Sequence, residues 1–94
     1  MSNVAGGWID WNFTISKEAQ QVFDAALKGL LGVQYTPLAF ATQVVAGTNY
    51  CFLSKAKVVY PNAPERVVKI YIFKPLPTSP EAKLHITQIV EVKP

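Results

Sequence analysis

The sequence predicts an α+β domain in which one amphipathic helix packs on an antiparallel sheet. Apolar residues recur at three- and four-residue spacing between residues 16 and 31, and at two-residue spacing after Pro37. These are the periods of a helix and of half-buried strands. The expected strands are joined by short connections, which pair neighbouring strands antiparallel. The 94 residues suit a single domain, residues 1–94, in which one helix face and one sheet face bury each other.

The N-terminal part is expected to hold a flexible arm, a short strand and the helix. Residues 1–7 are small and poorly patterned, and residues 8–13 suit a strand. Ser16 suits the helix N-cap, and Gly32 suits the position after the last turn. Gly29 is expected inside the helix, where glycine costs up to about 1 kcal/mol relative to alanine. The predicted apolar face consists of Ala19, Val22, Phe23, Ala26, Leu27, Leu30 and Leu31.

Four further strands are expected after the helix, at residues 38–45, 48–60, 67–74 and 83–92. Prolines interrupt the pattern at residues 61–65 and 75–80, because proline cannot donate to a strand ladder. The predicted core-facing residues are Tyr50, Phe52, Ala56, Val58, Val68, Ile70, Ile72, Leu84, Ile86 and Val90. The opposite face is expected to carry Cys51, Lys55 and Lys57.

Composition narrows the expected function. The net charge is +3, and the lysines alternate with apolar residues along strands, so no nucleic acid partner is expected. No apolar run approaches the roughly 20 residues that span a bilayer, and no signal peptide is visible, so no membrane partner is expected. A single cysteine, Cys51, excludes an intrachain disulfide and favours a cytoplasmic location, although a secreted mature form would have the same sequence. With His85 as the only histidine, we expect no catalytic residues, metal or cofactor.

Residues 43–47, Gln-Val-Val-Ala-Gly, form the most informative motif. They lie between two expected strands, where a hairpin tip normally carries Asn, Asp, Gly or Pro. Val44, Val45 and Ala46 instead make this tip apolar, which is typical of a surface that a partner covers. Gln43 is expected to form a hydrogen bond across the base of the turn.

The motif resembles the Gln-x-Val-x-Gly signature of the cystatins, inhibitors of papain-like cysteine proteases. Thr48-Asn49-Tyr50 extends the match in the manner of the stefin branch. Leu76-Pro77 lies between the last two expected strands, where stefins carry Leu-Pro, and Gly6-Gly7 precedes the first strand, where the family carries its N-terminal glycine. Trp8 and Trp11 depart from the stefin pattern.

The resemblance implies a cystatin-like fold, an antiparallel five-stranded sheet wrapped around one long helix. It also implies a reversible, tight-binding competitive inhibitor of papain-like proteases of the cathepsin type, in which an apolar wedge blocks the active-site cleft. Here Val44 to Gly47 are expected to be exposed, with the Gly47 backbone close to the enzyme, while Tyr50 turns inward. The implied protease-binding residues are Val4, Ala5, Gly6, Gly7, Gln43, Val44, Val45, Ala46, Gly47, Leu76 and Pro77.

Two other functions compete with inhibition. Trp8 and Trp11 favour a cystatin-fold protein-binding module without inhibitory activity. An enzyme on a helix-and-sheet scaffold would need acids or tyrosines in an apolar cavity, and 94 residues leave little room for one. Cys51 is expected to be a half-buried structural thiol and His85 a surface residue. The chain is expected to be a monomer, with hairpin exchange giving a domain-swapped dimer as a second state.

Overall fold

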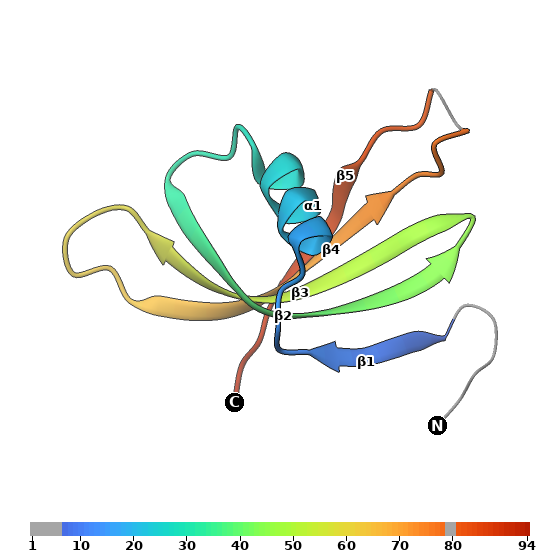
Figure 1. Cartoon of the computed structure of the whole chain (residues 1–94). Helices are drawn as coiled ribbons and strands as arrows, with labels where there is room; N and C mark the ends of the chain where they lie inside the picture. The colour runs from blue at the N-terminus through green and yellow to red at the C-terminus, as the bar shows by residue number, and fades with distance from the viewer. Residues whose placement is uncertain (1–6, 79–80) are drawn as a thin grey trace.

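The computed structural model describes residues 7–78 and 81–94 and confirms the α+β class. Within these residues one helix lies on a twisted, open sheet of five antiparallel strands (Figure 1). The strands follow one another across the sheet in chain order. The elements are β1 (Trp8–Asn12), α1 (Lys17–Leu27), β2 (Val33–Val45), β3 (Gly47–Val58), β4 (Glu65–Lys74) and β5 (His85–Glu91).

The helix begins where the sequence predicts. The Ser16 side chain accepts a hydrogen bond from the Ala19 backbone N–H at 3.1 Å, which satisfies a donor that the first turn leaves unpaired. The helix ends at Leu27, however, so its predicted extension to Leu31 is wrong. Gly29 follows the C-cap residue Lys28 and has φ +91°, a backbone conformation that glycine adopts far more readily than other residues.

The early end of the helix changes the core. Leu30 and Leu31 lie outside the helix and are 45% and 91% exposed, so they do not belong to the buried helix face. In the part of the chain that the structure describes, no helix is long and apolar enough to cross a bilayer.

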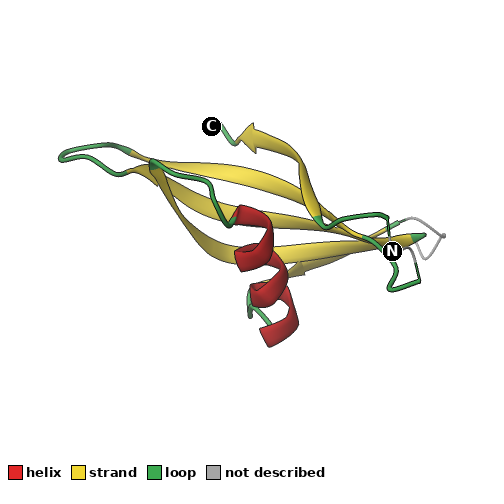
Figure 2. Ribbon diagram, turned by 90° about the horizontal axis from the view of Figure 1, so that it is seen from above, coloured by secondary structure: helices red, strands yellow, loops and turns green. Residues whose placement is uncertain are grey.

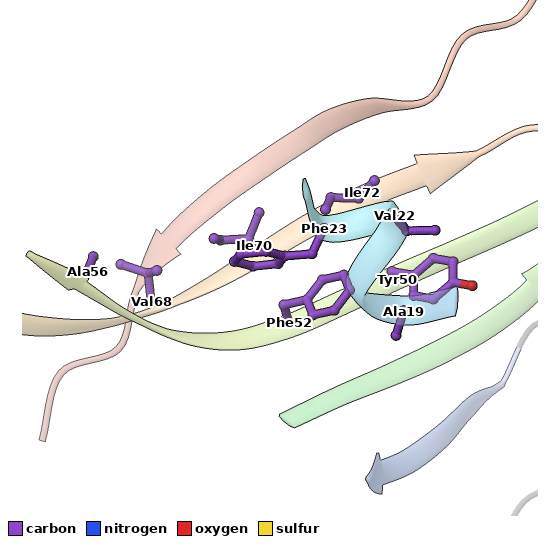
Figure 3. Close-up of a cluster of buried hydrophobic side chains, with 9 residues drawn as sticks. All are labelled: Ala19, Val22, Phe23, Tyr50, Phe52, Ala56, Val68, Ile70 and Ile72. Atoms are coloured by element: carbon purple, nitrogen blue, oxygen red, sulfur yellow. The ribbon is translucent and has the colours of Figure 1, made fainter. Parts of the chain in front are cut away.

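The core lies between α1 and the neighbouring strands β3 and β4. Figure 2 shows the helix on one face of the sheet, which we call the helix face; the opposite side is the outer face. Phe23 and Phe52 meet edge to face with ring centroids 4.9 Å apart, so they join the two layers at the centre of the core. The buried cluster consists of Ala19, Val22, Phe23, Tyr50, Phe52, Ala56, Val68, Ile70 and Ile72 (Figure 3).

Two register irregularities alter the predicted strands. β2 begins at Val33 rather than Leu38, and Pro37 is accommodated where the pairing with β3 shifts. The pairing of β4 with β5 shifts between Tyr71 and Ile72, so that Ile72 pairs with Ile86 whereas Ile70 pairs with Ile89. The shift exchanges the two faces of β5, and Ile89 takes the helix-face position predicted for Val90.

The remaining differences concern strand ends. β3 ends at Val58 rather than Tyr60, β4 begins at Glu65 rather than Val67, and β5 spans His85–Glu91 instead of residues 83–92. Val58 is 41% exposed and lies outside the buried cluster, so its predicted place in the core is wrong.

Candidate functional site

The segments predicted to bind a partner meet at one end of the sheet. Trp8 pairs with Gln43, which places Gly7 beside the β2–β3 hairpin. Thr48 pairs with Lys74, so the segment after β4 leaves the sheet next to the same hairpin (Figure 1). We call this region the hairpin end; it consists of Gly7, Gln43 to Gly47, Leu76 and Pro77. The predicted arm residues Val4, Ala5 and Gly6 lie outside the described residues.

The tip of the β2–β3 hairpin is narrow and apolar. Val45 pairs with Gly47, so Ala46 alone separates the two strands. Val44 and Val45 are 63% and 42% exposed, and Ala46 is exposed as well. Because consecutive strand residues point to opposite faces, the two valines present apolar surface on both sides of the tip.

Gly47 is buried, so the prediction that it is exposed is wrong. Its φ of +118° agrees with the expected need for glycine. A Cβ atom at this position would lie 2.7 Å from the Lys74 carbonyl oxygen and 2.8 Å from Phe73 Cζ. Gly47 therefore lets the hairpin pack closely on β4 and positions the exposed residues beside it.

Two contacts behind the tip hold the hairpin in place. The Asn49 side-chain amide donates a hydrogen bond to Gln43 Oε1 at 2.8 Å, and this is the bond across the base of the turn that the sequence predicts. Tyr50 is only 6% exposed, and its ring stacks on Phe52 at a centroid distance of 5.7 Å. The hairpin is thus fixed to the core directly behind its apolar tip.

The second loop adds apolar surface next to the hairpin. Leu76 is 46% exposed and Pro77 is exposed. The end of β4 is tied to the first turn of the helix by an ion pair in which Lys74 Nζ lies 2.8 Å from Glu18 Oε2. The hydrogen bond and charge of Lys74 lower the pKa of Glu18, and the hydrogen bond to Glu18 raises the pKa of Lys74. Since the side chains of Glu18 and Lys74 are 66% and 38% exposed, the pair contributes little to the stability of the fold.

A groove on the outer face is the feature that the sequence did not predict. It encloses about 460 Å³ and is lined by Trp8, Ile9, Asp10, Trp11, Ala41, Cys51, Lys69 and Tyr71. The useful signal was the pair of tryptophans in the first strand together with Tyr71, which faces away from the core residues Ile70 and Ile72.

The remaining candidates for chemistry are isolated from one another. Cys51 is 4% exposed, more buried than the expected half-buried thiol. His85 is exposed, as expected, and its Nδ1 atom lies 2.7 Å from the Lys83 carbonyl oxygen. Among residues 7–78 and 81–94, no three His, Cys, Asp or Glu side chains are grouped to hold a metal ion.

The hairpin end thus presents a narrow, exposed apolar surface. The contacts of Asn49 and Tyr50 behind it hold this surface in place. No family model, curated protein or solved structure matches the chain. Its function is therefore inferred from these residues and their arrangement.

Proposed function

We propose that this protein is a reversible, tight-binding competitive inhibitor of papain-like cysteine proteases of the cathepsin type, with a stefin-like cystatin fold. The observation that carries the proposal is the exposed apolar tip formed by Val44, Val45 and Ala46. The Gln-Val-Val-Ala-Gly motif and the neighbouring Leu76-Pro77 loop support it, because both lie at the same end of the sheet. Soluble proteins rarely leave such a tip apolar unless a partner covers it.

The hairpin end acts as a wedge. A papain-like active site is a cleft with a cysteine–histidine pair at its base. Val44 and Val45 fill apolar subsites and lose little side-chain freedom on docking, because branched side chains have few rotamers. The hairpin is already held by the Gln43–Asn49 bond and by Tyr50, so little backbone order is lost either. A preformed interface of about 800 Å² per partner can bind very tightly under these conditions.

The same geometry explains why the wedge resists cleavage. The hairpin backbone is paired up to Val45 and Gly47, and Ala46 alone lies between the strands. A peptide substrate offers an extended segment whose backbone is free to pair with the enzyme. Here that backbone is already paired within the sheet, and no carbonyl of the tip can be brought into attack geometry without opening the hairpin.

The proposal is tested by titrating active-site-calibrated papain with the protein and following peptide hydrolysis. The double variant Val44→Asp/Val45→Asp brings charge into the docked surface and should raise the inhibition constant at least about 100-fold, since burying unpaired charge costs several kcal/mol. A matched control is Val58→Asp/Val59→Asp, an exposed valine pair where β3 ends. It should inhibit like the wild-type protein. Equal inhibition by both variants, or none by the wild-type protein at large molar excess, would contradict the proposal.

The second candidate is a cystatin-fold binding module that does not inhibit. The observation in its favour is Trp8, which pairs with Gln43 and places a large side chain beside the hairpin. Binding and inhibition are separated by measuring complex formation with papain alongside its activity. Binding that leaves hydrolysis unchanged would favour the module over the inhibitor.

A further inference from the structure

The groove on the outer face is built from small residues between large ones. Its floor holds Ala41 of β2 and Cys51 of β3, which pair with each other and are 7% and 4% exposed. Trp8 of β1 and Tyr71 of β4 meet above that floor, with ring centroids 6.0 Å apart and planes inclined by 72°. Since β2 and β3 lie between these strands, the two rings reach toward each other across them. The hollow follows from this difference in side-chain size.

The walls of the groove are aromatic and carry one unpaired positive charge. Trp8, Trp11 and Tyr71 supply ring surface, and Lys69 lies between the cross-strand neighbours Leu53 and Val90. No carboxylate of the described residues pairs with Lys69, because the ion pairs there are Arg66–Glu91 and Lys74–Glu18.

The positive charge of Lys69 acts on Cys51 at the floor of the groove. Burial raises the pKa of the Cys51 thiol, while a hydrogen bond with Tyr71 and the positive charge of Lys69 act in the opposite direction. Lys69 and Cys51 also line the same groove, so this charge belongs to the groove itself.

One acidic residue limits which anions the groove accepts. Asp10 also lines it, and its carboxylate accepts the Trp11 backbone N–H at 2.8 Å. A second negative charge on a ligand would be repelled from this side. The groove therefore favours a ligand with a single anionic group, placed near Lys69.

We propose that this groove binds a planar aromatic carboxylate, with its ring against Trp8 and Trp11 and its carboxylate at Lys69. The groove volume of about 460 Å³ lies in the range of small-molecule sites, which combine apolar walls with a few polar groups. The site lies on the outer face and does not depend on the proposed protease inhibition.

The two tryptophans make the proposal directly testable. They are the only ones in the chain, so two indole N–H resonances report on the groove in a nitrogen–proton correlation spectrum. The probes are 2-naphthoate, its neutral amide 2-naphthamide, and the cationic 2-naphthylmethylamine. Titration with 2-naphthoate should shift both indole resonances with a Kd on the order of 1 mM or tighter, as expected for a ligand of this size.

The charge of Lys69 should set the order of affinities. The amide should bind about tenfold more weakly than naphthoate, and the amine more weakly still. Lys69→Met keeps the side-chain length and should remove the advantage of naphthoate over the amide. Lys57→Met, an exposed lysine of β3 outside the groove, should leave all three affinities unchanged. Melting temperatures of both variants show whether the fold is intact.

Three results would overturn the proposal. The first is no saturable shift of either indole resonance with naphthoate. The second is tighter binding of the amine than of the carboxylate, which would indicate a cation site at Asp10. The third is an unchanged preference for naphthoate in folded Lys69→Met.

Discussion

Replacing Gly47 by alanine tests how the hairpin is positioned. The new Cβ atom would lie 2.7 Å from a backbone oxygen of Lys74 and 2.8 Å from the Phe73 ring, both shorter than real Cβ contacts. The residue also has φ +118°, which alanine rarely adopts. The two effects act together, because the hairpin cannot move away from β4 without losing its pairing.

The size of the effect follows from these two terms. A non-glycine residue in such a backbone conformation costs about 1–3 kcal/mol. Forcing an extra methyl group into a packed contact costs about another 1–3 kcal/mol. The sum of roughly 2–6 kcal/mol is a large share of the 5–15 kcal/mol typical of a domain, and it should lower the melting temperature by about 10 °C or more.

Gly29→Ala is the matched control. Gly29 has φ +91° but nothing within 4 Å of its Cβ position, so the substitution adds backbone strain without a clash. We expect it to cost about 1–2 kcal/mol. Thermal and urea unfolding of both variants measure the difference. If Gly47→Ala melts within about 2 °C of Gly29→Ala, close packing against β4 does not position the hairpin.

Three further predictions concern the rest of the fold. Phe52→Ala should lower the free energy of unfolding by about 3–5 kcal/mol in urea titration, whereas Phe13→Ala, at a 73% exposed residue, should stay within about 0.5 kcal/mol of wild type. Ser16→Ala removes the helix cap and should cost about 1 kcal/mol, a fall of roughly 4–8 °C in melting temperature. Because Lys74 lowers the pKa of Glu18, ionised Glu18 stabilises the fold above its ordinary pKa of about 4.3, and this contribution is lost as pH falls through the lowered value. Glu18→Gln should therefore lose less stability than wild type between neutral and acidic pH; an equal loss in parallel melting curves would contradict this.

The sequence predicted the layers well because periodicity is a local property. The helix start at Ser16 and the buried stripe Val68, Ile70 and Ile72 follow from spacing alone. The end of the helix was missed because Leu30 and Leu31 continue the three- and four-residue spacing, while Gly29 adopts a backbone angle that periodicity does not reveal.

The two faces of β5 show a second limit of prediction from sequence. One shift in the pairing with β4 places Ile89, not Val90, opposite the core residue Ile70. Such a shift depends on the partner strand and leaves the alternation of apolar residues intact. No pattern within β5 itself could have located it.

The features of the candidate site that depend on neighbouring residues in the sequence were predicted. The features that depend on packing between residues far apart in the sequence were missed. The apolar tip at Val44 to Ala46 follows from the sequence, and so does the inward position of Tyr50. The burial of Gly47 against Phe73 was missed because it joins residues far apart in the chain. The outer groove was missed for the same reason, since Trp8 and Tyr71 meet only once the strands are in order.

The most direct test of the central claim is a hydrogen-exchange footprint of the protein in complex with papain. Docking through the hairpin end should slow backbone exchange at residues 43–48 and 74–78 and leave residues 58–62 unchanged. Protection at residues 58–62 instead, or no protection anywhere at saturating papain, would contradict the claim that the hairpin end is the protease-binding wedge.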